Sequence, residues 1–335
     1  MTDTRYDVVA LGNAIVDVIA PVSEAFIDEW SIVRDSMSLI DEARAEELTR
    51  AADGQELSGG SAANTAAGVA SFGGRAAYAG KVANDRLGDV FKADMAATGI
   101  AFDTPPLEGG PATARSIIFV TPGGARSMNT YLGASVLFSP QDIDADVIRA
   151  GGILYMEGYL FDREDAKAAF VHAAEIAAAA GRKTSVTLSD KFCVDRHRES
   201  FLHLIRNHID ILFANEAELL SLYETDNLDA AITRLRADSP LAAVTRGAGG
   251  SVLIGDGEPV AVPAEPIDFV VDTTGAGDQY AAGVLTGLSR GLPLASCARL
   301  GHIAAKEVIS HYGPRPETPY SGLAEAAEII LEPAR

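Results

Sequence analysis

Residues 272–278 read Asp-Thr-Thr-Gly-Ala-Gly-Asp and lead directly into a helical pattern over residues 279–290. Small residues just before a helix leave backbone amides open to a ligand, and the aligned dipoles of those amides bind anions. We therefore predict an anion hole over residues 275–277. Asp278 would lie beside it as the base that removes a proton from an attacking hydroxyl, an arrangement suited to phosphoryl transfer. The simpler alternative is a carboxylate that only interacts with the helix dipole.

A second glycine cluster lies at residues 58–64, Ser-Gly-Gly-Ser-Ala-Ala-Asn, ahead of an alanine-rich helical run that stops at residues 73–74. The adjacent glycines let a substrate approach backbone amides closely, and Asn64, one helical turn further on, offers a polar group to the same place. A tight turn with close helix packing is the alternative interpretation.

Short apolar runs alternate with helical patterns along much of the chain. The expected buried strands lie at residues 8–11, 153–156, 185–188, 209–214, 242–245 and 251–254. The expected helices lie at residues 163–180, where Gly181 is the C-terminal cap, and at 216–222 and 228–237. Because strand, helix and strand follow one another, the predicted fold class is α/β, with a doubly wound, mostly parallel sheet flanked by helices.

Another set of short strand patterns has no helix between its members. These strands are expected at residues 16–20, 36–40, 114–121 and 126–131, and the turn Pro122-Gly123-Gly124 joins the last two. We predict that they form a small β-sheet from two excursions, roughly residues 14–40 and 107–134, that acts as a lid over the strand ends. Residues 1–335 would then be a single domain with this lid.

Ligands of doubly wound sheets bind beyond the carboxyl ends of the strands. The polar residues expected there are Asn13, Glu157, Asp190, Asn215, Glu218 and the run Thr245-Arg246-Gly247. They would form a polar rim along one edge of the main sheet.

The chain is strongly acidic, with 47 Asp and Glu residues against 27 Lys and Arg and a formal net charge of −20. Because a nucleic-acid backbone is bound largely through Lys and Arg, this balance argues against a nucleic-acid polymer as ligand. No apolar run approaches the roughly 18 residues of a membrane span, and the first residues carry no apolar signal region. Two cysteines, Cys193 and Cys297, match no metal or redox spacing. We expect a cytoplasmic protein that binds no membrane.

Over nearly its whole length the chain resembles the ribokinase-like carbohydrate and nucleoside kinases. The resemblance rests on Gly59-Gly60 followed by Asn64, and on the highly specific run at residues 272–278. Within that family, the stretches closest to the adenosine kinases are residues 12–17, 126–134 and 215–218. The resemblance implies a doubly wound α/β core with a β-sheet lid, and transfer of the γ-phosphoryl group of ATP, with Mg²⁺, to a primary hydroxyl.

The resemblance also implies a role for each matching position. Asp278 would be the base, and Gly275, Ala276 and Gly277 would form the anion hole, with Arg126 closing over the transferring phosphate. The acceptor would be held by Asn13, Asp17, Gly59, Gly60 and Asn64, and an apolar slot for adenine would include Leu132 and Phe161, which a core would equally use. The nucleotide would be held by Asn215, Glu218, Thr245, Arg246 and Gly247, with Asn215 and Glu218 holding Mg²⁺ through water. Asp272, Thr274 and Gly313 would form a site for a monovalent cation such as K⁺.

Three functions fit these observations. The first is an ATP-dependent kinase that phosphorylates the 5′ hydroxyl of adenosine or a related nucleoside, as in purine salvage. The second is a sugar kinase of the same family, acting on ribose, fructose or a keto-deoxy sugar acid. The third is a non-catalytic sensor of a nucleoside or sugar, against which the intact Asp278 and residues 275–277 argue. Each takes a small-molecule ligand, and the sequence leaves both a monomer and a homodimer open.

Overall fold

A computed structural model describes residues 4–122 and 125–331, so Gly123 and Gly124 of the predicted turn lie outside the described residues. An eight-stranded sheet forms its centre, in the order β13-β12-β11-β10-β9-β8-β1-β5. Its strands are β1 (Tyr6–Leu11), β5 (Ala76–Ala79), β8 (Gly151–Glu157), β9 (Lys183–Thr187), β10 (Ile211–Asn215), β11 (Leu241–Thr245), β12 (Ser251–Ile254) and β13 (Val260–Val262). All neighbours from β11 to β5 are parallel, and β12 and β13 are antiparallel.

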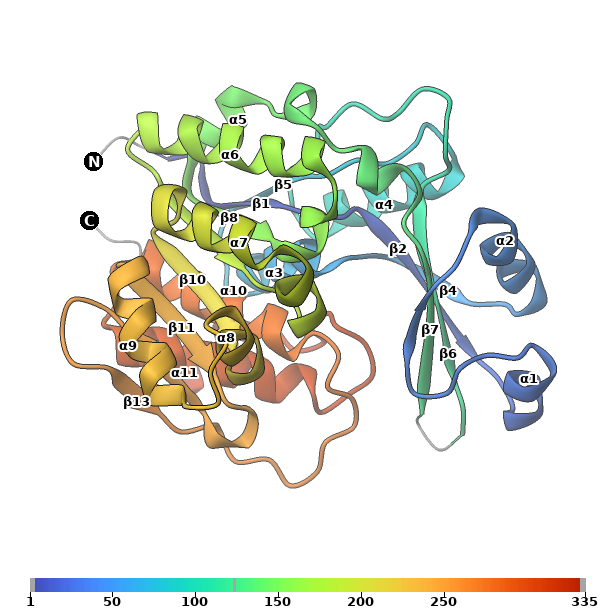
Figure 1. Ribbon diagram of the computed structural model, residues 1–335. Helices are drawn as coiled ribbons and strands as arrows, with labels where there is room; N and C mark the ends of the chain where they lie inside the picture. Colours follow the sequence, from blue (N-terminus) through green and yellow to red (C-terminus); the bar gives the residue numbers. More distant parts are fainter. Residues whose placement is uncertain (1–3, 123–124, 332–335) are drawn as a thin grey trace.

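Helices cover both faces of this main sheet (Figure 1), so its inner strands are buried on both sides. Val8 and Ala10 of β1 pack into one core cluster, and Val9 and Leu11 pack into the other. The first cluster includes side chains of α3 (Ser61–Ser71), α4 (Arg86–Ala97), α10 (Ala276–Ser289) and α11 (Leu294–Val308). The second includes side chains of α5 (Ala145–Ala150), α6 (Glu164–Ala179), α7 (Lys191–His208), α8 (Glu216–Leu222) and α9 (Leu228–Asp238). The predicted doubly wound α/β fold is confirmed.

Helix α6 illustrates how the sequence places these elements. Its buried residues recur at helical spacing, at Ala166, Ala169, Phe170, Ala173, Ala174 and Ala177. Gly181 follows the helix with a φ of 68°, the left-handed conformation of a C-terminal glycine cap. Outside the main layers, α12 (Tyr320–Ala326) packs on α11, and four short 3₁₀ helices complete the described secondary structure, at Gly133–Leu137, Pro140–Asp142, Gly158–Asp162 and Gly247–Gly249.

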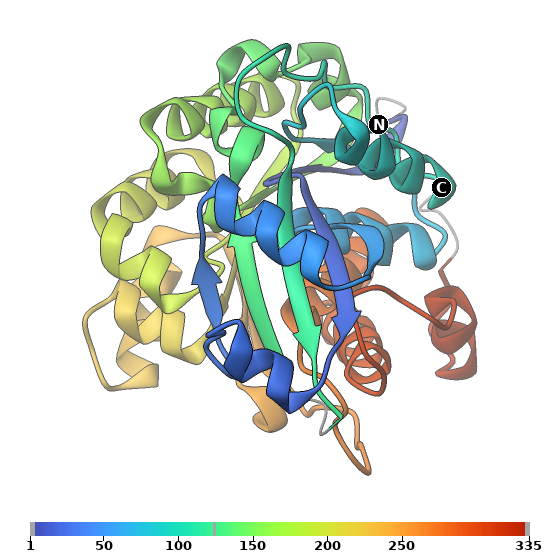
Figure 2. The ribbon, with the colours of Figure 1, turned by 90° about the vertical axis from the view of Figure 1, so that its right-hand side faces the viewer.

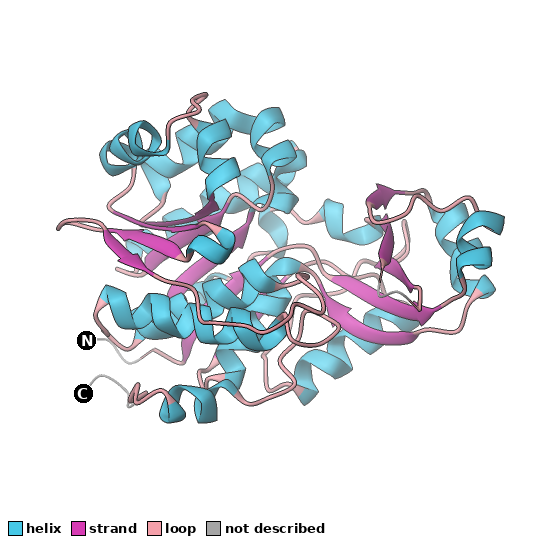
Figure 3. Cartoon of the chain, turned by 90° about the horizontal axis from the view of Figure 1, so that it is seen from below, coloured by secondary structure: helices cyan, strands magenta, loops and turns pink. Residues whose placement is uncertain are grey.

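A second sheet of five strands lies beside the main one, on the right in Figure 1, in the order β3-β7-β6-β2-β4. Its strands are β2 (Ile15–Pro21), β3 (Met37–Leu39), β4 (Gln55–Gly59), β6 (Ala114–Val120) and β7 (Arg126–Tyr131). Helices α1 (Glu24–Glu29) and α2 (Glu42–Ala51) cover its outer face (Figure 2). All four predicted strands of this sheet are present. In Figure 3 the strands of the two sheets form two separate groups. That the small sheet moves as a lid stays a prediction.

Strands β4 and β5 were not predicted. Strand β5 reads Ala-Ala-Tyr-Ala and so has none of the β-branched residues that favour strands. Strand β4 reads Gln-Glu-Leu-Ser-Gly, a polar stretch that pairs antiparallel with β2. Because β4 belongs to the small sheet, the first excursion runs on to Gly59 rather than ending near residue 40.

The two faces of the small sheet differ in chemistry. Val16 and Val18 of β2 are buried in the cluster that includes Ile27 of α1 and Leu48 of α2. Since successive residues alternate between faces, Asp17 lies on the opposite face, toward the main domain. Asp17 is in register with Ser116, whose hydroxyl in turn is 2.9 Å from that of Thr130. The inner face of the small sheet therefore carries a polar row.

A search of the helices within the described ranges finds none that is both long and apolar enough to span a membrane.

Candidate active site

Asp278 lies in the first turn of α10, where α10 meets α3. Its Oδ1 accepts a hydrogen bond from the Ser61 hydroxyl at 2.5 Å, and its Oδ2 accepts one from the Asn64 amide at 3.0 Å. The Thr65 hydroxyl donates to the backbone carbonyl of Asp278 at 3.2 Å. Ser61 and Asp278 are 217 positions apart. The two glycine motifs of the sequence therefore meet at one carboxylate.

The surroundings of Asp278 suit a proton acceptor. Burial raises the pKa of its carboxyl, while the hydrogen bonds from Ser61 and Asn64 and the positive charge of Arg315 act in the opposite direction. A carboxylate whose pKa lies above its ordinary value holds a proton more strongly, and this brings it closer to the range of an efficient general base.

Helix α10 begins with no side-chain cap, and the residue before it, Gly275, has a φ of 79°. Glycine adopts this left-handed conformation without strain. A Cβ on Gly275 would lie 2.7 Å from the Cα of Pro314, so a larger residue does not fit beside the loop at residues 313–315. The first amides of a helix have no acceptor within it. The predicted anion hole at residues 275–277 thus coincides with a helix N-terminus that has no side-chain cap, although the Ala276 amide donates to the Thr273 carbonyl at 3.2 Å.

Glu157, at the end of β8, joins Asn13 to the start of α3. Its carboxylate accepts hydrogen bonds from the Asn13 backbone amide at 2.7 Å, the Asn13 side-chain amide at 2.9 Å and the Ala62 backbone amide at 2.7 Å. Burial raises the pKa of Glu157 to about 7, although these donors favour the charged form. The Oδ1 atoms of Asn13 and Asn64 are buried, and within residues 4–122 and 125–331 neither has a hydrogen-bond partner. A ligand with hydroxyl groups would satisfy both oxygens.

Asp17 comes from β2 and lies against the same group of residues. Its side chain is 9% exposed, and burial raises its pKa to about 7, with Arg315 and Arg126 lowering it and Asp278 raising it. A Cβ on Gly59 would lie 2.3 Å from Oδ2 of Asp17, so a larger residue in the neighbouring strand would displace the Asp17 carboxylate. The next residue, Gly60, has a φ of 93°. The structure thus gathers the predicted acceptor-binding residues Asn13, Asp17, Gly59, Gly60 and Asn64 around Asp278.

Arg126, at the start of β7, contacts the main domain. Its Nη1 lies 2.6 Å from Oδ2 of Asp272 in an ion pair whose angles differ from those of a hydrogen bond, and its guanidinium lies 5.4 Å from the centre of the Tyr312 ring. Asp272 also accepts hydrogen bonds from the amides of Thr274 and Gly313, each at 3.0 Å. The carboxylate expected to bind a monovalent cation is therefore occupied by an arginine, and such a cation stays a prediction.

The nucleotide-binding residues predicted at the ends of β10 and β11 also lie together. Asn215 caps α8, and it and Glu218 hold each other through three hydrogen bonds of 2.6 to 2.9 Å. Asn215 is in register with Thr245, after which Arg246 and Gly247 lie exposed in a tight turn. Burial raises the pKa of Glu218 to about 7, and Asp190 adds to this effect.

The two apolar residues expected in the adenine slot have different surroundings. Phe161 is 2% exposed, and its ring stacks on Phe201 in the core with 4.6 Å between the ring centres. Leu132 is half-buried and follows β7 directly. Tyr159 is 39% exposed, and burial together with the charges of Asp190 and Asp278 raises the pKa of its hydroxyl. Of Phe161 and Tyr159, it is therefore Tyr159 whose ring is exposed.

Sequence reasoning did not assign a role to Ser61 or Arg315. Ser61 directly follows the glycine pair at residues 59–60, so its position was a usable signal. Arg315 lies two residues after Gly313, in a loop that the sequence linked only to a monovalent cation, and only the folded chain brings it near Asp17 and Asp278.

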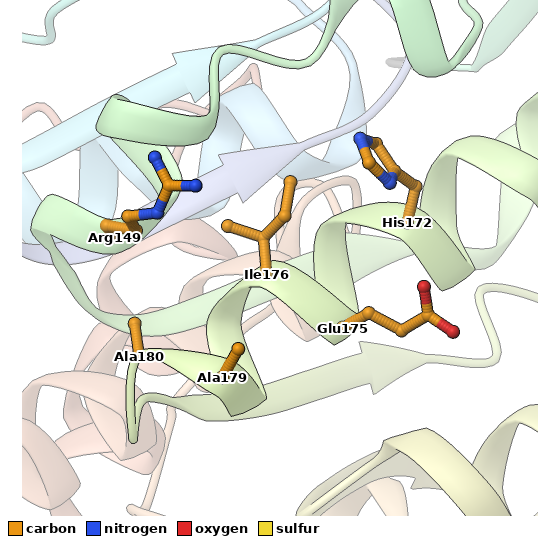
Figure 4. Close-up of a pocket in the computed structure, with 6 residues that line it drawn as sticks. All are labelled: Arg149, His172, Glu175, Ile176, Ala179 and Ala180. Atoms are coloured by element: carbon orange, nitrogen blue, oxygen red, sulfur yellow. The ribbon is translucent and has the colours of Figure 1, made fainter.

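Two surface pockets lie apart from these residues. One, of about 360 Å³ along α6, is lined by Arg149, His172, Glu175, Ile176, Ala179 and Ala180 (Figure 4). The other, of about 240 Å³ beside β5, has Tyr6, Asp103, Pro105, Gln141 and Val147 among its lining residues. Neither pocket is lined by Asp278, Asp17 or Asn64, so neither is part of the candidate active site.

Comparison with known proteins bears on this site. Residues 7–320 match the pfkB family of carbohydrate kinases. The chain belongs to this family. An adenosine kinase structure from Sinorhizobium meliloti is 52% identical to it, with a TM-score of 0.88, and the match covers 96% of this chain and 99% of that one. For a probable sugar kinase from Rhizobium etli CFN 42, the identity is 50%, the TM-score is 0.90 and the coverage is 98% and 100%.

More distant pfkB relatives include an adenosine kinase of Saccharomyces cerevisiae, 26% identical over 329 residues that cover 91% of this chain and 95% of the relative. The resemblance found in the sequence is thus confirmed. As a pfkB kinase, the protein is a phosphotransferase with an alcohol group as acceptor, and its family implies ATP as the phosphoryl donor and Mg²⁺ as the metal ion.

Proposed function

We propose that this pfkB kinase transfers the γ-phosphoryl group of ATP to the 5′ hydroxyl of adenosine or a related nucleoside. The observation that carries this proposal is the pair of buried, unpartnered oxygens on Asn13 and Asn64 beside Asp17. Among the described residues these two acceptor oxygens have no donor, and the Asp17 carboxylate lies beside them, so the site calls for a ligand rich in hydroxyl groups, which a ribose supplies. The exposed ring of Tyr159 at the same strand ends offers a surface for a planar base.

In this proposal Asp278 takes the proton of the acceptor hydroxyl as the hydroxyl oxygen attacks the γ-phosphorus, and the bond from that phosphorus to the β–γ bridging oxygen breaks, so that ADP leaves. The amides of Gly275, Ala276 and Gly277 stabilise the charge that develops on the transferring group, because they are fixed at a helix N-terminus before the reaction starts. Ser61 and Asn64 keep the Asp278 carboxylate in one orientation. Arg126 contributes positive charge from the small sheet.

The residues at the end of β10 fit a magnesium ion held through water. Each Glu218 oxygen accepts one hydrogen bond from Asn215, which leaves lone pairs free for water ligands. The described part of the chain holds no group of three His, Cys, Asp or Glu side chains that would bind a metal directly, and this agrees with an ion bound mainly by water and phosphate oxygens. Bound there, Mg²⁺ would neutralise charge on the phosphates of ATP.

A sugar kinase is the second candidate, supported by the similar identity to the Rhizobium etli sugar kinase. Among its substrates, a keto-deoxy sugar acid fits least well. Asp17, Asp278 and Glu157 lie together at the acceptor site, and a carboxylate on the substrate would add to this negative charge.

The test is ATP consumption by the purified protein with Mg²⁺ and a panel of adenosine, inosine, guanosine, ribose, fructose and keto-deoxygluconate. We expect adenosine to give the highest kcat/KM, and phosphorus NMR of the product to place the phosphate on the 5′ oxygen. Turnover of a free sugar with adenosine inert would move the assignment to the sugar kinases. Tight binding of adenosine without any ATP consumption would favour the sensor.

A further inference from the structure

Arg315 lies in the loop at residues 313–315, which packs against the start of α10. The Gln279 amide donates to the Pro314 carbonyl at 2.8 Å and to the Asn64 carbonyl at 3.0 Å, so it joins this loop to α3. Pro314 also lies so close to Gly275 that no side chain fits between them. The backbone that carries Arg315 is therefore fixed to both glycine motifs.

The guanidinium of Arg315 contacts Ser58 in β4, the strand of the small sheet that leads into α3. Its Nη2 donates to the Ser58 carbonyl at 2.7 Å and to the Ser58 hydroxyl at 2.9 Å. From α4, the Asp94 carboxylate accepts hydrogen bonds from the backbone amide of Ser58, at 2.9 Å, and from its hydroxyl. Ser58 is thus held between a cation and an anion of the main domain, directly before the glycine pair at residues 59–60.

The other nitrogens of the guanidinium form no hydrogen bond within the described residues that would explain their burial. Its Nε and Nη1 atoms are buried and have no partner among the residues that the structure describes. Asp94, Asp17 and Asp278 are the acids whose charges act on Arg315, together with the Tyr78 hydroxyl. A buried cation facing three acids from separate elements balances their charge rather than completing a hydrogen-bond network.

We propose that Arg315 is a positioning residue of the acceptor site, an inference that rests on the proposed function. Arg315 fixes Ser58 and the glycine pair, and it balances the negative charges of Asp17 and Asp278. It acts through these residues and takes no part in the bond changes. The pKa shifts agree with this role, because burial raises the pKa of both carboxyls while Arg315 lowers it.

Other charged and titratable groups also face these two carboxyls. Asp278 receives hydrogen bonds from Ser61 and Asn64 of α3 and faces Glu157 and Tyr155 of β8, and Asp17 faces Arg126 of β7. None of them is a cation on the main-domain side. Removal of Arg315 should therefore leave the acids less easily ionised, and an acceptor that needs ionised Asp17 and Asp278 should bind and react only at higher pH.

The test compares wild type with Arg315→Met, Arg315→Lys and, as a control, Arg299→Met, whose side chain is 50% exposed on α11. With the acceptor that wild type uses best, we expect Arg315→Met to raise the acceptor KM about tenfold or more and to move the acid limb of kcat/KM up by about one pH unit. The KM for ATP should stay within about twofold in all variants. Arg315→Lys keeps the charge but loses the fork of donors, so its acid limb should match wild type while its acceptor KM rises.

A second measurement needs no acceptor, so it separates this inference from the proposed function. The loss of unfolding free energy in Arg315→Met should grow from pH 5 to pH 8, because the acids it leaves unbalanced are charged at the higher pH. A loss independent of pH, or an acceptor KM and acid limb equal to wild type, would overturn the positioning role even if adenosine is the substrate. If Arg315→Met does not fold, Arg315→Lys decides, and a wild-type acceptor KM in that variant would overturn the role.

Discussion

The acceptor side and the nucleotide side of this site are held together in different ways. On the acceptor side, Ser61 and Asn64 of α3 hold Asp278 of α10, and Glu157 of β8 holds Asn13. On the nucleotide side, Asn215 and Glu218 lie three positions apart and hold each other. The first arrangement depends on contacts between distant parts of the chain, and the second is a local capping box.

This difference predicts where substitutions have the larger effect. The acceptor side is buried, so removing one partner leaves another polar group without a hydrogen bond or a counter-charge. On the nucleotide side, Glu218 is buried, but its partner Asn215 and the neighbouring Arg246 are exposed, so water can replace a hydrogen bond that Asn215 loses. Acceptor-side changes should therefore alter catalysis and stability strongly, and nucleotide-side changes should alter mainly the use of ATP.

The largest effect is expected for Asp278→Asn. The change removes the proposed base but keeps the shape of the side chain, so kcat should fall by a factor on the order of 10³ or more with little change in fold. Steady-state kinetics and circular dichroism measure the two quantities. Asp256→Asn, an exposed change in the turn after β12, is the control. Near-normal turnover in Asp278→Asn would rule out the assignment of the base.

The pH dependence of stability should reveal Glu157. Its pKa is about 7 in the folded protein against an ordinary value of 4.5, so the folded state binds the proton more strongly than the unfolded state. This contribution to stability is complete below about pH 4.5 and is lost as the pH rises through 7, by an amount on the order of 3 kcal/mol. Urea unfolding at several pH values should therefore show a smaller fall in Glu157→Gln than in wild type. Parallel curves would contradict the burial of an ionisable Glu157.

A smaller effect is expected for Asp17→Asn on the acceptor alone. The amide offers one acceptor oxygen instead of two, so the acceptor KM should rise about 10- to 100-fold while the KM for ATP changes little. Asp53→Asn, an exposed change just before β4, should alter neither value. An equal rise in both KM values would show that Asp17 supports the whole site rather than the acceptor side.

The smallest effect is expected on the nucleotide side, for Glu218→Gln. Glutamine can still complete the capping box, so α8 should persist. Loss of the charge should raise the KM for Mg-ATP about three- to tenfold and leave the acceptor KM unchanged. Glu216→Gln, in the same helical turn but outside the capping box, is the matched control. A rise in the acceptor KM would mean that the two sides are coupled.

Much of the fold could be predicted because its signals are local. Strand β7 (Arg126–Tyr131) and helix α8 (Glu216–Leu222) have the predicted bounds, since alternation and helical spacing are visible within a few residues. Strands β4 and β5 carry no such pattern. Their neighbours in the sheets, β2 and β1, supply the hydrogen bonds that make strands of a polar run and an alanine-rich one.

The same division holds for the site. Asp278 and Asn64 could be found because each lies at a glycine-marked helix start. Phe161 and Tyr159 could not be told apart, because the short 3₁₀ turn at Gly158–Asp162 decides which ring enters the core. For Arg315, the sequence around it carries no signal that places it at the acceptor site.

By itself, the sequence determined the alternation of strands and helices, the two glycine motifs and the carboxylate beside the anion hole, because helix starts and buried strands are properties of a few neighbouring residues. The tertiary structure decided which groups face that carboxylate. Ser61 and Asp278 are 217 positions apart, and Ser58 and Arg315 are 257 apart. Only the packing of α3, α10 and the small sheet brings them within hydrogen-bond distance, and their burial there is what shifts the pKa values of Asp17, Glu157 and Asp278.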